Sequence, residues 1–180
     1  MPESGETVRT FVAVLLSEAA AREAERLLDR LRPLARCCWV TRAQLHITLR
    51  FLGELSPSAV ERVRSAVAVV TVQPFDIELH RAGAFPDLAR PRTLWLGGDR
   101  GASELTALAG RVDDALFEVG IPRNDRPFRP HLTLARAEGS PLPPALMREL
   151  ERVPSVAWRC SDISLMRSRL TPRGAVYTRL

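Results

Sequence analysis

Two four-residue segments of the 180-residue chain share one pattern: a histidine, an apolar residue, a threonine and a leucine. The first is residues 46–49 (HITL), and the second is residues 131–134 (HLTL), 85 positions later. In a β-strand, side chains two positions apart project from the same face. Each segment therefore predicts a strand that carries a histidine and a threonine together. His80, the third histidine, has no such partner, and we expect it to be a surface or structural residue.

The residues around each segment extend this alternation. The polar face of the first strand is expected to hold Gln44, His46, Thr48 and Arg50, and its core face Leu45, Ile47, Leu49 and Phe51. The second strand presents Arg129, His131 and Thr133 on its polar face. If the two polar faces meet across a groove, two imidazoles and two hydroxyls surround one small volume.

Two opposed imidazoles suit a displacement at phosphorus. One imidazole, neutral, takes a proton from the attacking water or hydroxyl, and the other, protonated, gives a proton to the departing alkoxide. An unperturbed pKa near 6.5 lets both forms coexist around neutral pH. The hydroxyls of Thr48 and Thr133 can donate hydrogen bonds to the phosphoryl oxygens. This chemistry needs no metal and no cofactor, and the two segments are too alike to show which histidine is the acid.

The elements that must position these strands follow the same order in both halves of the chain. Each half predicts a strand, a helix, a strand with the motif, a second helix and further strands. Strands are expected at residues 10–16, 39–52, 75–79, 93–96, 163–166 and 175–178 and around Leu132, with helices from 17 to 31, from 57 to 70, at 103–119 and at 143–152. A loop is expected between residues 79 and 93. The repeated order, with Ser-Pro at 56–57 and again at 140–141, indicates an internal duplication.

Composition narrows the class of protein. The chain is 46% hydrophobic and carries a formal net charge of +5, and each of its 26 basic residues is arginine. Such a basic surface favours anionic partners such as RNA, because guanidinium groups bind phosphate with paired hydrogen bonds. No apolar run approaches the length of a membrane span, and the polar first ten residues do not resemble a secretory signal. Three cysteines without ligand spacing argue against a zinc site and fit a reducing compartment, so we expect a cytoplasmic protein.

Residues 46–54 (HITLRFLGE) and 128–136 (FRPHLTLAR) resemble the two signatures of the 2H phosphoesterase superfamily. More narrowly, they resemble its RNA 2′,3′-cyclic phosphodiesterases, also called 2′-5′ RNA ligases. Residues 9–16, 83–86 with 91–97, and 165–170 with 174–177 also resemble segments of that family. The resemblance implies an α+β fold of two βαβαβ lobes, related by a pseudo-two-fold axis, with mainly antiparallel sheets facing a central cleft. It also implies a single domain over residues 1–180.

The same resemblance implies an activity and assigns roles. RNA ending in a 2′,3′-cyclic phosphate would be hydrolysed to a 2′-phosphomonoester without a metal, with 2′-5′ ligation as the possible reverse reaction. His46 would be the proton donor and His131 the proton acceptor, while Thr48, Thr133 and Arg136 bind the phosphate. Simple alternation places Arg136 on the strand face opposite His131. Arg136 can therefore contact the phosphate only if a strand end or a bulge redirects its side chain. Neither a membrane nor an obligate protein partner is expected, and the protein is expected to be a monomer.

Two other functions remain open from the sequence. One is a non-catalytic RNA-binding module that uses the basic groove, and the other is a phosphodiesterase for a small cyclic nucleotide metabolite. The RNA-binding module predicts salt-dependent binding of RNA without turnover. The second differs from the RNA enzyme only in its substrate.

Overall fold

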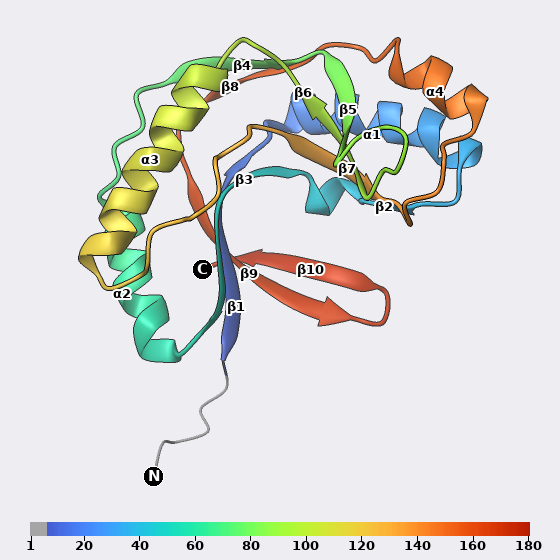
Figure 1. Ribbon diagram of the computed structural model, residues 1–180. Coiled ribbons are helices and arrows are strands. Elements are labelled where there is room, and N and C mark those ends of the chain that lie inside the picture. Colours follow the sequence, from blue (N-terminus) through green and yellow to red (C-terminus); the bar gives the residue numbers. More distant parts are fainter. Residues whose placement is uncertain (1–6) are drawn as a thin grey trace.

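The computed structural model describes residues 7–180 and consists of ten strands and four α-helices in that part of the chain (Figure 1). The first six residues, part of the polar start that argued against a secretory signal, lie outside the described residues. In chain order the elements are β1 (Val8–Leu15), α1 (Glu18–Leu31), β2 (Cys38–Trp39), β3 (His46–Leu55), α2 (Pro57–Ala68), β4 (Phe75–Leu79), β5 (Arg81–Phe85), β6 (Thr93–Gly97), α3 (Ala102–Glu118), β7 (Leu132–Arg136), α4 (Pro144–Leu150), β8 (Val156–Cys160), β9 (Ser164–Thr171) and β10 (Gly174–Arg179). Short 3₁₀ turns follow α1 (Arg32–Leu34) and precede β3 (Arg42–Gln44).

The strands form two four-stranded sheets and one pair. Sheet A has the order β10-β9-β1-β3, and sheet B the order β2-β7-β6-β5. β4 and β8 form the separate pair, which runs along one side of the molecule in Figure 1. All paired neighbours are antiparallel. The predicted α+β class with antiparallel sheets is therefore confirmed.

The two halves of the sequence exchange elements when they fold. Sheet A takes β1 and β3 from the first half but β9 and β10 from the second, while sheet B receives β2 and β5 from the first half. The helices cross over in the same way, because α3 packs with α2 against β3, whereas α1 packs against β8. Each lobe is thus built from both halves, and neither motif strand lies in a sheet made by its own half alone.

The helices begin where the sequence predicts and bury the expected stripe. The hydroxyl of Ser17 accepts a hydrogen bond from the backbone N–H of Ala20 (3.2 Å), and Ser56 does the same for Ala59 (3.3 Å). In α1 the fully buried positions are Ala20, Ala24, Leu27, Leu28 and Leu31. Among the described residues, no helix is long and apolar enough to cross a membrane.

Three details differ from the sequence-based expectations. The segment 81–85, expected in a loop, is strand β5, because its backbone pairs with β6 in an antiparallel ladder. Strand β8 has no counterpart among the expected strands, although its residues alternate between buried and exposed positions. The second helix of the second half has Pro143 at its N-cap, so Ser140-Pro141 precedes it without capping it. The local sequence pattern of β5 and β8 gives too little signal to predict them. Both strands form because they pair with distant strands, β5 with β6 and β8 with β4.

Candidate active site

His46 begins strand β3, and two hydrogen bonds fix its ring. Nδ1 lies 2.8 Å from the carbonyl oxygen of Gln44, and Nε2 lies 3.0 Å from Oγ1 of Thr48. A carbonyl oxygen can only accept, so Nδ1 carries the proton and donates it to Gln44. The Nε2 atom is therefore the one that can exchange a proton, and the Thr48 hydroxyl lies beside it, as the shared strand face predicts.

His131 immediately precedes strand β7 and is held in the same way. Its Nδ1 lies 2.6 Å from the carbonyl oxygen of Arg129, which again sets the proton on Nδ1 and leaves Nε2 for chemistry. Thr133 lies two positions further on, half-buried like the histidine. In contrast to the first motif, no hydrogen bond among the described residues joins this histidine to its threonine.

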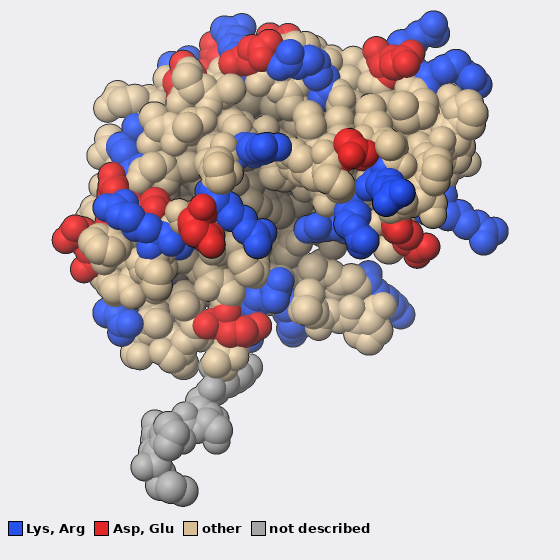
Figure 2. Space-filling model, in the orientation of Figure 1, with Lys and Arg blue, Asp and Glu red and all other residues tan. Residues whose placement is uncertain are grey.

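The two motif strands lie next to each other although they belong to different sheets. β3 of sheet A and β7 of sheet B are in contact. His131 is near enough to His46 for its charge to lower the pKa of His46. Figure 2 shows a hollow between the two lobes, bordered on this face by arginine side chains. The four residues His46, Thr48, His131 and Thr133 therefore come together as the sequence predicts.

Both histidines have a pKa below the ordinary value of 6.5. For His46 the main cause is burial, which disfavours the imidazolium; the Gln44 carbonyl raises the pKa, and the charge of His131 lowers it further. For His131 burial is again the main cause, opposed by the Arg129 carbonyl, and the nearby Arg136 guanidinium lowers the pKa. Both shifts favour the neutral ring in the free protein, and a bound anion would favour the protonated form.

A β-bulge follows each threonine and changes what the next residues face. Opposite β1, Ala13 pairs with Thr48 but Val12 with Arg50, so Leu49 is an extra residue. Opposite β6, Trp95 pairs with Thr133 but Leu94 with Ala135, so Leu134 is an extra residue. The two bulges are 85 positions apart, the same separation as the histidines.

The first bulge overturns the expected faces of Arg50 and Phe51. Arg50 does not line the polar face: its side chain is buried, forms an ion pair with Asp113 of α3 at 3.2 Å and donates to the carbonyl of Pro122. Phe51 does not lie in the core and is 51% exposed. It pairs with Phe11, whose ring centroid is 4.7 Å from that of His46, so Phe51 lies on the histidine's face.

The second bulge turns Arg136 toward the site. Leu134 and Ala135 are both buried, and Arg136 is exposed on the face of His131 and Thr133. Its Nη1 donates to Oγ1 of Thr93 at 3.1 Å, and its charge lowers the pKa of His131. The bulge at Leu134 therefore places Arg136 on the face of His131, which simple alternation could not do. Arg136 occupies the position that Phe51 has in the first motif.

Aromatic rings support both histidines, and the sequence reasoning missed them. The edge of Tyr177 packs against His46 with a centroid distance of 5.2 Å, and Phe85 packs against His131 at 5.0 Å. Phe85 in turn contacts Trp95, whose ring lies where a Cβ on Gly83 would be, at 2.3 Å. Single aromatic residues on distant strands give no local signal, and only the sheet pairing brings them to the histidines.

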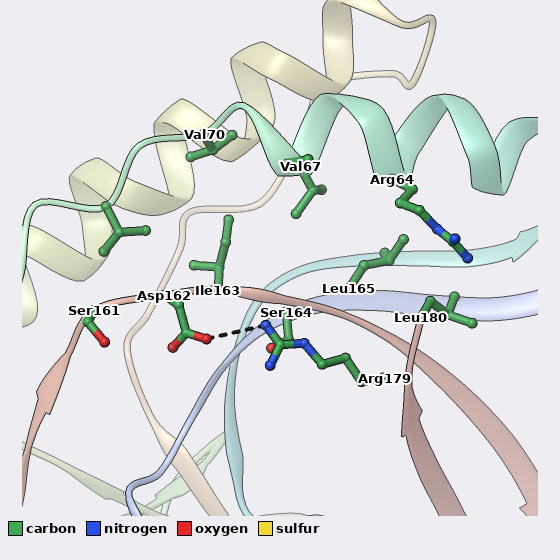
Figure 3. A pocket seen from close by; sticks show the side chains of 12 residues that line it. Arg64, Val67, Val70, Ser161, Asp162, Ile163, Ser164, Leu165, Arg179 and Leu180 are labelled. Carbon is green, nitrogen blue, oxygen red and sulfur yellow. Dashed lines mark hydrogen bonds and ion pairs between the residues drawn. The ribbon is translucent and has the colours of Figure 1, made fainter.

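Other surface features of the described residues lie apart from the two histidines. Among residues 7–180, no three His, Cys, Asp or Glu side chains are grouped so that they could hold a metal ion. A cavity of about 310 Å³ lies between the end of α2 and strands β9 and β10, where Asp162 pairs with Arg179 at 3.3 Å (Figure 3). Its lining includes neither His46 nor His131. His80 is exposed, as expected.

Comparisons with known proteins agree with this geometry. The family model of the 2′-5′ RNA ligase superfamily matches residues 17–172. An RNA 2′,3′-cyclic phosphodiesterase of Aeropyrum pernix is 38% identical over 138 residues, which cover 75% of this chain and 78% of that protein. One of Archaeoglobus fulgidus is 33% identical over 94% of this chain and 96% of its own.

Solved structures show the same fold. The crystal structure of TT0787 of Thermus thermophilus superposes with a TM-score of 0.78 and 32% identity, covering 96% of this chain and 94% of that one. The crystal structure of Escherichia coli LigT complexed with 3′-AMP gives a TM-score of 0.77 at 25% identity, covering 97% and 96%.

Proposed function

The chain belongs to the 2′-5′ RNA ligase superfamily, and we propose that it hydrolyses RNA ends that carry a 2′,3′-cyclic phosphate to 2′-phosphomonoesters. The observation that carries this proposal is the pair of histidines on contacting strands, each with Nδ1 bound to a carbonyl two residues earlier. The names of the related proteins from Aeropyrum pernix and Archaeoglobus fulgidus support the RNA substrate.

In the proposed reaction, water attacks the phosphorus and the bond to the 3′ oxygen breaks. His131 accepts the proton of the attacking water on Nε2, and His46 donates a proton from Nε2 to the departing 3′ oxygen. The products are a 3′-hydroxyl and a 2′-phosphate, and a second proton exchange restores both rings. The bound phosphate raises the pKa of the neighbouring imidazoles, which helps one of them to be protonated before the reaction.

Threonine and arginine side chains are proposed to bind the phosphate. Thr48 and Thr133 flank the histidines on their own strand faces, where their hydroxyls can donate to the non-bridging oxygens. Arg136 adds a fixed positive charge beside His131, because the bulge at Leu134 brings it to that face. These groups supply the charge stabilisation, and the scheme uses no metal and no cofactor.

The same proton transfers would also serve 2′-5′ ligation. A 5′-hydroxyl in place of water would attack the cyclic phosphate and yield a 2′-5′ linkage, with the 3′ oxygen again leaving as a hydroxyl. Since one chain supplies both histidines, we propose that residues 1–180 act as a single catalytic unit and as a monomer, with RNA as the partner.

The test is the product formed from an oligoribonucleotide that ends in a 2′,3′-cyclic phosphate, with EDTA present. We expect the wild-type protein to yield the 2′-phosphate, and His46→Ala and His131→Ala each to lower turnover by about 10²- to 10⁴-fold. His80→Ala is the matched control and should keep wild-type turnover.

Two outcomes would contradict the proposal. RNA binding without any product would favour a binding module, and turnover of small cyclic nucleotides alone would favour a metabolite phosphodiesterase.

A further inference from the structure

Phe51 is an exposed aromatic residue on the face of sheet A that carries His46. Half of its side-chain surface is accessible, at 51%, although it lies in the middle of a strand. The guanidinium carbon of Arg9 lies over the ring, 4.7 Å from its centroid. The guanidinium therefore covers one face of the ring, and this stacked pair is here called the Phe51–Arg9 platform.

The position of this platform is fixed relative to the catalytic groups. Phe51 pairs with Phe11 across the strands, and Phe11 contacts the His46 ring. Along β3, Phe51 is three residues beyond Thr48, which is up to about 10 Å of strand. That reach is longer than the span from a cyclic phosphate to the base on the same ribose, and it matches the base of a neighbouring nucleotide.

A basic hollow adjoins the platform. A cavity of about 280 Å³ lies at the end of β1 beside β9, and its lining includes Arg9, Arg167 and Arg169 with one acidic residue, Glu54. Excess positive charge in a concave site attracts phosphate. Arg167 pairs with Thr10 and so projects, with Arg169, from the face of sheet A opposite Phe11. Arg9 is the arginine of this lining that belongs to the platform, and a phosphate next to a base on Phe51 would meet its charge.

We propose that the Phe51–Arg9 platform binds the base of the nucleotide that precedes the cyclic-phosphate terminus. The inference rests on the proposed function and specifies its substrate: an oligoribonucleotide end in preference to a mononucleoside cyclic phosphate. Aromatic rings and arginine planes stack on unpaired bases of RNA, and this stacking tolerates any base because each base has a π-face. The platform would thus select for chain length and not for sequence.

The measurement is the ratio of kcat/KM for a dinucleotide ending in a 2′,3′-cyclic phosphate to kcat/KM for the mononucleoside 2′,3′-cyclic phosphate. Loss of one base stack should lower this ratio about tenfold in Phe51→Leu, which keeps an apolar side chain but removes the ring. Phe51→Trp should retain the ratio. With a dinucleotide whose first residue lacks its base, the wild type should lose its preference for the dinucleotide over the mononucleoside. In Phe51→Leu, removing that base should cause no further fall in the ratio.

A matched control lies on the other side of sheet A. Phe117 of α3 is 50% exposed and has the Arg123 guanidinium over its ring at 4.6 Å, but α3 packs on the face that holds buried Arg50. Phe117→Leu should leave the ratio at its wild-type value. An unchanged ratio in Phe51→Leu, or an equal fall in both variants, would overturn the proposal.

Binding measurements separate this inference from the proposed function. The probes are a dinucleotide and a mononucleoside that each carry a 3′-phosphate, titrated by calorimetry. Phe51→Leu should weaken the dinucleotide about tenfold more than the mononucleoside. If the wild type turns over neither cyclic substrate, the proposed function fails. The binding comparison still shows whether the Phe51–Arg9 platform binds the base of the preceding nucleotide. Equal affinities of wild type and Phe51→Leu for the dinucleotide would refute it.

Discussion

The two motif strands, β3 and β7, have the same backbone design but different side chains at equivalent places. In each, a histidine stands at or just before the first strand residue, a threonine follows two residues later, and a bulge comes after that threonine. The residue that the bulge buries is Arg50 in one strand and Ala135 in the other. The next residue, which returns to the cleft face, is Phe51 in one strand and Arg136 in the other.

This comparison suggests different proposed roles for two strands of the same backbone design. The histidines and threonines, the proposed reactive groups, are the same in both motifs, whereas the residues beyond the bulges differ. Arg136 places charge beside His131, and Phe51 places an aromatic surface beyond His46. The sheet B side is thus suited to phosphate and the sheet A side to a base. Substitutions and pH changes can test this division, from the largest expected effect to the smallest.

The buried arginine of β3 has no charged counterpart in β7, so its removal should affect stability. Arg50→Ala leaves the Asp113 carboxylate, 18% exposed, without its main partner and should lower the free energy of unfolding by about 3 kcal/mol. Denaturant unfolding measures this change. The double variant Arg50→Met with Asp113→Leu should recover much of the loss, because no charge is then left unpaired.

The control for that prediction is Arg26→Ala. Arg26 pairs with Glu23 on the surface, with the arginine side chain 71% exposed, and its loss should have little effect. If Arg50→Ala were as mild as Arg26→Ala, the buried ion pair would not be what holds α3 against β3.

Arg136 should influence one histidine more than the other. Arg136→Gln removes the positive charge that lowers the pKa of His131, so that pKa should rise toward its ordinary value while His46 shifts less. The imidazole proton signals followed by NMR across pH provide the measurement. The same variant should raise KM for the cyclic phosphate about tenfold, as expected for one lost charge-assisted contact. Equal shifts at both histidines would contradict the assigned geometry.

The pH dependence should differ between the free protein and the complex. Catalysis requires one protonated and one neutral imidazole, a state most populated between the two pKa values, which both lie below 6.5. The optimum of kcat/KM should therefore lie below pH 6.5. The anionic substrate raises both pKa values, so the optimum of kcat should lie at higher pH. An optimum of kcat/KM above pH 7, or a flat profile, would contradict the two-histidine scheme.

Much of the candidate site could be predicted from sequence because the proposed catalytic residues lie in two short strand segments. A histidine and a threonine two residues apart share a face in any strand, and the repeated motif indicated that two such faces meet. The caps at Ser17 and Ser56 could be predicted for the same reason, since capping depends on adjacent residues.

The features that could not be predicted depend on pairing between distant strands. The bulges that bury Arg50 and expose Phe51 and Arg136 arise from register with β1 and β6, and strict alternation assigned Arg50 and Phe51 to the wrong faces. Phe85 lies near His131 because β5 belongs to sheet B, and Tyr177 lies near His46 because β10 belongs to sheet A. The exchange of β5 and β9 between lobes likewise leaves no trace in local pattern.

Two histidines in equivalent geometry are proposed to have different roles, His46 as acid and His131 as base. The most direct test uses a cyclic phosphate substrate in which sulfur replaces the bridging 3′ oxygen. A thiolate needs much less protonation to leave than an alkoxide, because thiols are far more acidic. The measurement is kcat for wild type, His46→Ala and His131→Ala on the oxygen and sulfur substrates. We predict that the sulfur substrate restores most of the turnover lost in His46→Ala and little of that lost in His131→Ala. Rescue of His131→Ala instead, or equal rescue of both, would contradict the assignment.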